Sequence, residues 1–127
     1  MIGLLLLTHD RLGESLVECV EHILSERPEQ IAVLGVRAQD EPSEMVPVTQ
    51  RMVAAVDGGE GVLVLTDIYG ATPSNIAAKV LRPGQVEGVA GVGLPMLLRA
   101  LTHRERDMDT LIRRALAGGC DGVLHMR

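Results

Sequence analysis

Short continuous runs of hydrophobic residues alternate along this chain with longer segments whose apolar residues recur at helical spacing. The first run, residues 2–7, contains no polar side chain, which is typical of a strand covered on both faces in a parallel sheet. Similar runs predict strands over residues 31–36, 62–66 and 88–92. A last apolar run, residues 123–126, predicts a short strand at an edge of the sheet, because so little chain remains to cover it.

The segments between these runs predict helices. Over residues 12–24 the apolar residues form one stripe and the glutamates lie off it, and Pro28 closes the segment. A second helix is expected to begin at Ser43, with Pro47 near its first turn, and to end at the glycines of residues 58–61. Further helices are expected over 76–81, 94–101 and 111–116, the last ended by Gly118 and Gly119.

This alternation of strand and helix predicts an α/β fold. We expect a three-layer sandwich with a mainly parallel sheet, strand order 2-1-3-4, right-handed crossovers and a short C-terminal edge strand. The 127 residues carry no linker or repeat, so residues 1–127 are expected to form one domain.

Ligands of such sheets bind beyond the carboxyl ends of the strands, where the strand order reverses. His9 follows the first strand and Asp67 follows the third, so the order 2-1-3-4 brings both to one crevice. A carboxylate that accepts the N–H of one imidazole nitrogen leaves the other nitrogen with a free lone pair. The sequence therefore predicts a histidine prepared to act as a nucleophile or a base.

The segment after Asp67 predicts a pocket for an anion of phosphate size. Thr72 is expected to be the N-cap of the following helix, with Pro73 in its first turn. Gly70 permits close backbone approach, Thr72 and Ser74 offer hydroxyl groups, and the helix start supplies unpaired N–H groups.

Composition narrows the class of ligand. The net charge is −5, from 12 basic and 17 acidic residues, and the only aromatic residue is Tyr69, so nucleic acid, anionic membranes and flavins are unfavourable ligands. The opening apolar run becomes polar at Thr8, too early for a signal peptide or a membrane span. The two cysteines are too few for a disulfide framework, and we expect a cytoplasmic protein with free thiols.

Other chemistries find no support in the motifs. The chain has no P-loop and no Gly-x-Ser-x-Gly elbow. Cys19 and His22 lie one helical turn apart, but no further ligand pair completes a metal site, so neither a metal nor another cofactor is expected. The segment from Gly91 to Met96 lacks the third glycine of a dinucleotide fingerprint and is interpreted as a tight turn.

Four blocks of sequence carry a family resemblance. They are LTH at residues 7–9, LTDIYGATPSN at 65–75, VAGVGLPML at 89–97 and GV at 122–123. In this order and at this spacing they resemble the mannose-type enzyme IIA family of the bacterial phosphotransferase system, which transports sugars, over essentially the whole chain.

The resemblance implies a phosphotransferase that needs no cofactor. In that family the histidine at the position of His9 accepts a phosphoryl group from the histidine-containing phosphocarrier protein and passes it to a IIB component, while the aspartate at the position of Asp67 holds the ring. It also implies a homodimer in which the last strand takes part, and contact with the membrane only through a transporter complex. No IIB domain follows Arg127, so a separate IIB component or a regulatory target is expected as the acceptor.

The sequence departs from the family pattern at the proposed site. Asp10 stands where members commonly have glycine, and a carboxylate there would repel a phosphoryl group if it pointed inward. Ala71 and Thr72 replace a more usual glycine and serine. Two alternatives stay open: the phosphotransfer subunit of a dihydroxyacetone kinase, and a regulatory module that binds its targets according to its phosphorylation without sugar transport.

Overall fold

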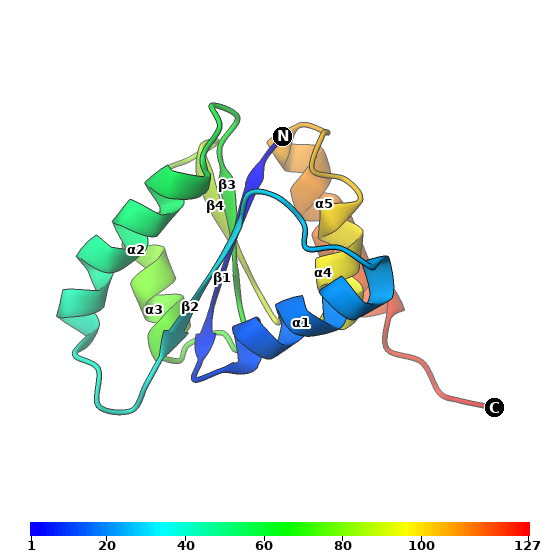
Figure 1. The fold of residues 1–127 in the computed structure, drawn as a ribbon, viewed down its shortest axis with the longest axis horizontal. Coiled ribbons are helices and arrows are strands. Elements are labelled where there is room, and N and C mark those ends of the chain that lie inside the picture. Colours follow the sequence, from blue (N-terminus) through cyan, green and yellow to red (C-terminus); the bar gives the residue numbers. More distant parts are fainter.

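A four-stranded parallel sheet forms the middle layer of the computed structural model, which describes all residues from 1 to 127. Its strands lie in the order β2-β1-β3-β4, as predicted. The strands are β1 (Gly3–His9), β2 (Ile31–Val36), β3 (Val62–Thr66) and β4 (Val86–Ala90). The strands β2 and β3 have the predicted bounds, and all four run in the same direction, so their carboxyl ends meet at one edge of the sheet (Figure 1).

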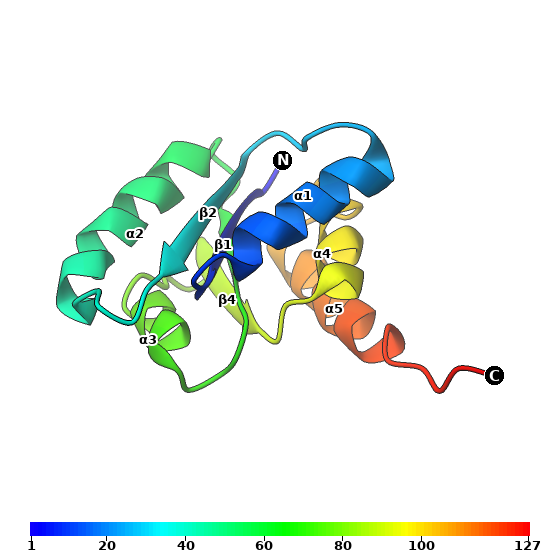
Figure 2. The same cartoon turned by 60° about the horizontal axis from the view of Figure 1, so that its bottom comes forward.

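Helices cover both faces of the sheet and complete the three layers (Figures 1 and 2). One face carries α1 (Leu12–Leu24), α4 (Leu94–Leu101) and α5 (Met108–Asp121). The other face carries α2 (Pro42–Val56) and α3 (Thr72–Ala78). None of these helices combines the length and the apolar character needed to cross a membrane.

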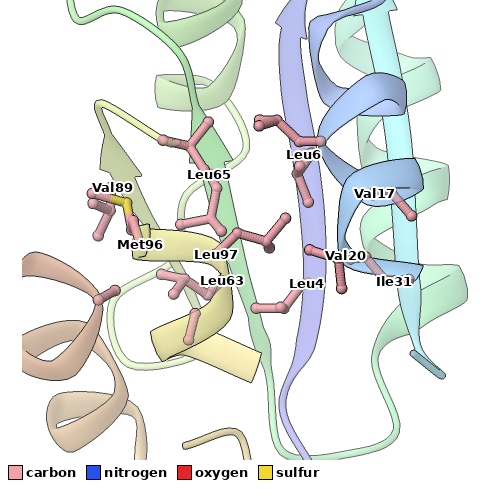
Figure 3. Close-up of a cluster of buried hydrophobic side chains, with 14 of the residues drawn as sticks. Leu4, Leu6, Val17, Val20, Ile31, Leu63, Leu65, Val89, Met96 and Leu97 are labelled. Carbon is pink, nitrogen blue, oxygen red and sulfur yellow. The ribbon is translucent and has the colours of Figure 1, made fainter. Parts of the chain in front are cut away.

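The continuous apolar run of β1 is explained by its two covered faces. Leu4 and Leu6 point into the core beneath α1 and α4, where they lie near Val17 and Leu97 (Figure 3). Leu5 and Leu7 point the other way, into the second core beneath α2 and α3. Because side chains alternate across a strand, a central strand buried on both faces must be apolar at every position.

The C-terminal half of the chain differs from the prediction in where its elements end. Helix α5 continues through Gly118 and Gly119 to Asp121 instead of ending at them. A Cβ atom on Gly118 would lie 2.6 Å from Cβ of Arg99, so this glycine lets α5 pack closely on α4. The fourth strand lies two residues earlier than predicted, because the N–H groups of Gly91 and Val92 both donate to the Thr66 carbonyl and turn the chain there.

Two helices on the other face also begin or end differently. Helix α2 begins at Pro42, so Pro47 lies inside the helix rather than near its first turn. Helix α3 ends at Ala78, three residues short of the predicted end, because the chain turns at Lys79 and Val80 toward β4.

The predicted C-terminal edge strand is wrong for the single chain. Val123, Leu124 and Met126 are 82%, 80% and 90% exposed, and residues 123–127 pair with no strand. Helix α5 carries the chain away from the sheet, so its last residues project from the body of the molecule (Figure 1). The outer edge of β4 consequently has no strand beside it.

One buried arginine ties the amino ends of the strands together. Arg104 is 4% exposed, and its guanidinium donates from Nε to the Ile2 carbonyl at 2.9 Å, from Nη1 to the Glu29 carbonyl at 2.6 Å and from Nη2 to the Gln30 carbonyl at 2.7 Å. These carbonyls precede β1 and β2, so a single side chain links the starts of the two strands, where the Gln30 carbonyl also accepts the N–H of Leu4 at 3.0 Å.

We expect Arg104→Met to lower the free energy of unfolding by about 2–4 kcal/mol, because it removes three hydrogen bonds of a charged donor and leaves the Ile2 and Glu29 carbonyls without that donor. Urea denaturation measures the change. Arg106→Met, at an exposed position two residues away, is the matched control and should change stability by less than about 0.5 kcal/mol. Equal losses in the two variants would contradict this role for Arg104.

Candidate functional site

His9 and Asp67 meet at the carboxyl edge of the sheet, as the sequence predicted. His9 is the last residue of β1 and its side chain is 47% exposed, whereas Asp67 follows β3 and its side chain is 11% exposed. The ring Nδ1 of His9 lies 2.8 Å from Oδ2 of Asp67. Because an ionised carboxylate can only accept, Nδ1 carries the hydrogen and the lone pair of the neutral ring is on Nε2.

The Asp67 carboxylate is held by backbone donors as well as by the ring. The N–H of His9 donates to Oδ2 at 2.9 Å, and the N–H of Ile68 donates to Oδ1 at 3.0 Å. Partial burial acts to raise the pKa of Asp67, but the hydrogen bonds from His9 and Ile68 and the positive charge of a protonated His9 ring outweigh it. The pKa of Asp67 is therefore lowered, and the group is an anion at neutral pH.

The register of β1 against β3 brings His9 and Asp67 to the same end of the sheet. Leu7 of β1 lies opposite Thr66 of β3, so His9 and Asp67 follow at adjoining strand ends. The Thr8 side chain is fully buried and its hydroxyl accepts the N–H of Gly13 at 2.9 Å, which ties the start of α1 to the end of β1. The His9 side chain consequently projects from a backbone that is anchored by β3 on one side and by the start of α1 on the other.

The loop after Asp67 is shaped by Gly70 and Ser74. Gly70 has a φ of +89°, a conformation that glycine adopts without steric penalty. Its N–H donates to Ser74 Oγ at 2.8 Å, and the same hydroxyl donates to the Ala71 carbonyl at 3.2 Å. These contacts give Ser74 a part in holding the loop, and no feature of the sequence pattern predicts this role.

The predicted N-cap of α3 is wrong. Ala71 occupies that position in extended conformation, and Thr72 is the first residue of the helix, followed by Pro73. No side chain caps the helix start. A capping oxygen at residue 71 would have few donors to accept, because Pro73 at the second helical position has no N–H.

The site lies open at the surface. Ile68 is 59% exposed and Tyr69 is 87% exposed, and both belong to the loop that begins beside His9. The five principal pockets of the molecule do not include His9 among their lining residues. An open histidine flanked by exposed apolar side chains is a geometry for contact with a macromolecule rather than for enclosure of a small ligand.

No cluster of three or more His, Cys, Asp or Glu side chains is arranged to hold a metal ion. Cys19 and Cys120 are both exposed and are free thiols.

Residues 3–115 match the protein family described as the PTS system fructose IIA component, EIIA-man. This chain belongs to that family. The match covers β1 to α5 up to Ala115 and therefore includes His9, Asp67 and the loop between β3 and α3.

Relatives of the family agree with this assignment. The PTS system mannose-specific EIIAB component of Escherichia coli K12 is 29% identical over 125 residues, which cover 96% of this chain and 38% of the relative. The chain thus spans about two fifths of the length of the curated relatives it matches. The mannose/sorbose specific IIA subunit from Enterococcus faecalis has the same fold, with a TM-score of 0.87, 24% identity and coverage of 99% and 95%. The phosphotransferase system component EIIA from Streptococcus agalactiae also has this fold, with a TM-score of 0.86 and 21% identity. The comparison covers 98% of this chain and 97% of that protein.

The lowered pKa of Asp67 predicts how this EIIA-man chain responds to acid. A carboxyl whose pKa is lower in the folded state contributes stability above its unfolded pKa of about 3.9, and that contribution is lost as the pH falls through the folded value. We expect Asp67→Asn to lower the free energy of unfolding by about 1 kcal/mol at pH 6. The effect is modest because water reaches the half-exposed His9 ring and screens its contact with Asp67. The difference between the two chains should shrink below about pH 4.

Urea denaturation between about pH 6 and pH 2 measures this difference. In a His9→Gln background the effect of Asp67→Asn should be smaller, because the ring contact is gone while the backbone donors of residues 9 and 68 remain. A difference between the native chain and Asp67→Asn that stays constant over this range would contradict a stabilising ionised contact.

Proposed function

We propose that this chain is a phosphohistidine carrier, in which His9 accepts a phosphoryl group from the histidine-containing phosphocarrier protein and passes it to a separate IIB component or a regulatory partner. The observation that carries the proposal is the 2.8 Å contact between His9 Nδ1 and Asp67, which leaves Nε2 as the free nitrogen of a ring 47% exposed at the surface. Membership of the EIIA-man family supports the same assignment.

The proposed step exchanges one P–N bond for another. The Nε2 lone pair of His9 attacks phosphorus as the P–N bond to the donor histidine breaks, and the electron pair of that bond returns to the donor ring. The His9 ring gains positive character while Nδ1 keeps its hydrogen, and the adjacent Asp67 carboxylate stabilises that charge. Positioning and electrostatic stabilisation are the main requirements of phosphoryl transfer, so no metal or cofactor enters the step.

The loop between β3 and α3 is proposed to contact the phosphoryl oxygens through Gly70, Thr72 and Ser74. Thr72 lies at the first position of α3, where backbone N–H groups have no partner within the helix. The Gly70 N–H and the Ser74 hydroxyl are engaged with each other at 2.8 Å, so their contact with phosphate requires that this hydrogen bond open or be shared.

Phosphorylation of the purified chain tests the carrier role. With phosphoenolpyruvate, enzyme I and the phosphocarrier protein, we expect one acid-labile, alkali-stable phosphoryl group per chain, visible by mass spectrometry. His9→Ala should abolish it, because Nε2 is the acceptor. His22→Gln is the matched control, since His22 is an exposed histidine on α1, and it should be labelled like the native chain.

Asp67→Ala should be labelled at least about tenfold more slowly than the native chain, because the ring loses its orienting partner. Label that persists in His9→Ala, or a native chain that takes no label, would overturn the proposed function.

We also propose that the chain acts as a homodimer through its C-terminal residues. Two observations support this: apart from one bridge between Val86 and Arg82, the outer edge of β4 is unpaired, and residues 123–126 form an exposed apolar segment able to lie beside it. Beside that edge lies a small apolar pocket of about 110 Å³, lined in part by Gly88, Ala78 and Leu81. A segment supplied by a second copy would cover both the edge and the pocket.

Deletion of residues 123–127 should convert a dimer to a monomer, because it removes the strand proposed to pair with the β4 edge. Sedimentation equilibrium at micromolar concentrations measures the mass. His125→Ser is the control, since it keeps the apolar side chains and should remain dimeric. A truncated chain that stays dimeric, or a full chain that is monomeric, would contradict this arrangement.

A further inference from the structure

Asp10, the residue directly after His9, holds a backbone conformation that favours glycine. Its φ is +44°, in the left-handed region that glycine adopts freely and that aspartate and asparagine enter more readily than most residues with a side chain. Ser25 and Gln30 share this feature, but both lie in the connection between α1 and β2, away from the proposed site. Strained residues beside reactive groups are often retained for function.

The fold imposes this conformation on residue 10. Its N–H donates to the Val36 carbonyl at 2.9 Å, which fixes it against the end of β2. Its own carbonyl oxygen lies where a Cβ atom on Gly35 would be, so the two backbones are in close contact. Residue 10 cannot turn away without breaking the contact with β2, and its side chain must leave the backbone beside His9.

The carboxylate of Asp10 is exposed and belongs to none of the ion pairs of the molecule. The nearest cation in sequence, Arg11, pairs with Glu14 at 3.3 Å. Consecutive Cα atoms are about 3.8 Å apart, so the Asp10 charge cannot lie further than about 10 Å from the centre of the His9 ring. Together with Asp67, it gives this end of the sheet two carboxylates around one histidine.

We propose that Asp10 raises the phosphoryl-transfer potential of His9, an inference that rests on the proposed function. A phosphoryl group on Nε2 brings additional negative charge to the same end of the sheet as the Asp10 carboxylate, at a separation of about 7 Å. Asp67 accepts the Nδ1 hydrogen and stabilises the ring cation, but Asp10 has no donor to offer and acts on the phosphoryl oxygens by repulsion alone. The phosphorylated state is thereby made less stable, and the group is passed on more readily.

The charge and the backbone strain can be separated by two substitutions. Asp10→Asn removes the charge and keeps a residue that tolerates the left-handed region, whereas Asp10→Gly removes both the charge and the strain. Asp10→Glu keeps the charge. Asp109→Asn is the control for net charge, because Asp109 is exposed in the first turn of α5 and lies far from His9. Its neighbour Met108 lies against Gly61, at the amino end of the strands.

The equilibrium between the phosphocarrier protein and this chain is measured first. We expect Asp10→Asn and Asp10→Gly to shift it toward phosphorylated His9 by about three- to tenfold at low salt, the size expected for unit charges about 7 Å apart where the effective dielectric constant lies between that of a protein surface and that of bulk water. In about 0.5 M salt the shift should fall by at least half. Asp10→Glu and Asp109→Asn should stay within about twofold of the native chain.

A second measurement needs no protein partner. Phosphoramidate, a small anionic P–N donor, should phosphorylate His9 faster in Asp10→Asn than in the native chain, again with an effect that salt weakens. If the native chain accepts no phosphate from the carrier protein but this difference is found, the proposed function fails and the repulsion at His9 stands. An effect seen in Asp10→Gly alone, an effect of Asp10→Asn that salt does not change, or no effect in either variant would overturn the proposal.

Discussion

The hydrogen bond between the Asp67 carboxylate and the His9 ring is the interaction on which the proposed chemistry of this chain depends. It exists because β1 and β3 are neighbours in a parallel sheet and end together, with Leu7 opposite Thr66. The carboxylate also accepts the N–H groups of His9 and Ile68, so its position is set by backbone as well as by the ring. A histidine anchored in this way presents one nitrogen to the protein and the other to solvent.

The rest of the fold can be understood as support for that contact. The strand that carries His9 is buried on both faces, and helices held by two separate apolar cores keep it from shifting relative to β3. At the other end of the sheet, Arg104 joins the amino ends of β1 and β2 by three hydrogen bonds. Close packing of this kind transmits little motion to the strand ends, which favours a preorganised site.

Most of the sheet and the central pair of the site could be predicted from the sequence. The strands β2 and β3 are continuous apolar runs bounded by polar or glycine residues, and the rule for strand order then places His9 near Asp67. The end of α5 could not be predicted, because Gly118 serves contact with α4 rather than a turn, and this depends on which helices are neighbours. The position of Ser74 in the loop depends in the same way on the left-handed conformation of Gly70.

The C-terminal segment shows a different limit of prediction from sequence. Residues 123–126 have the composition of a strand, but a strand requires an edge within reach, and α5 leads them away from the edge of β4 in the same chain. The apolar pattern of these residues is therefore not used in the fold of the single chain. The positive φ of Asp10 was also beyond sequence reasoning, because it follows from contacts with Gly35 and Val36 on another strand.

The protonation of the two ring nitrogens of His9 tests the central claim most directly. In a chain labelled with ¹⁵N, two-dimensional ¹H–¹⁵N spectra of the histidine rings at a pH where His9 is neutral distinguish a nitrogen that bears hydrogen from one that does not. The contact with Asp67 predicts hydrogen on Nδ1 and a bare Nε2 in the native chain, and a mixture of tautomers in Asp67→Ala. Hydrogen on Nε2 in the native chain would contradict the account, because the exposed nitrogen could not then attack phosphorus.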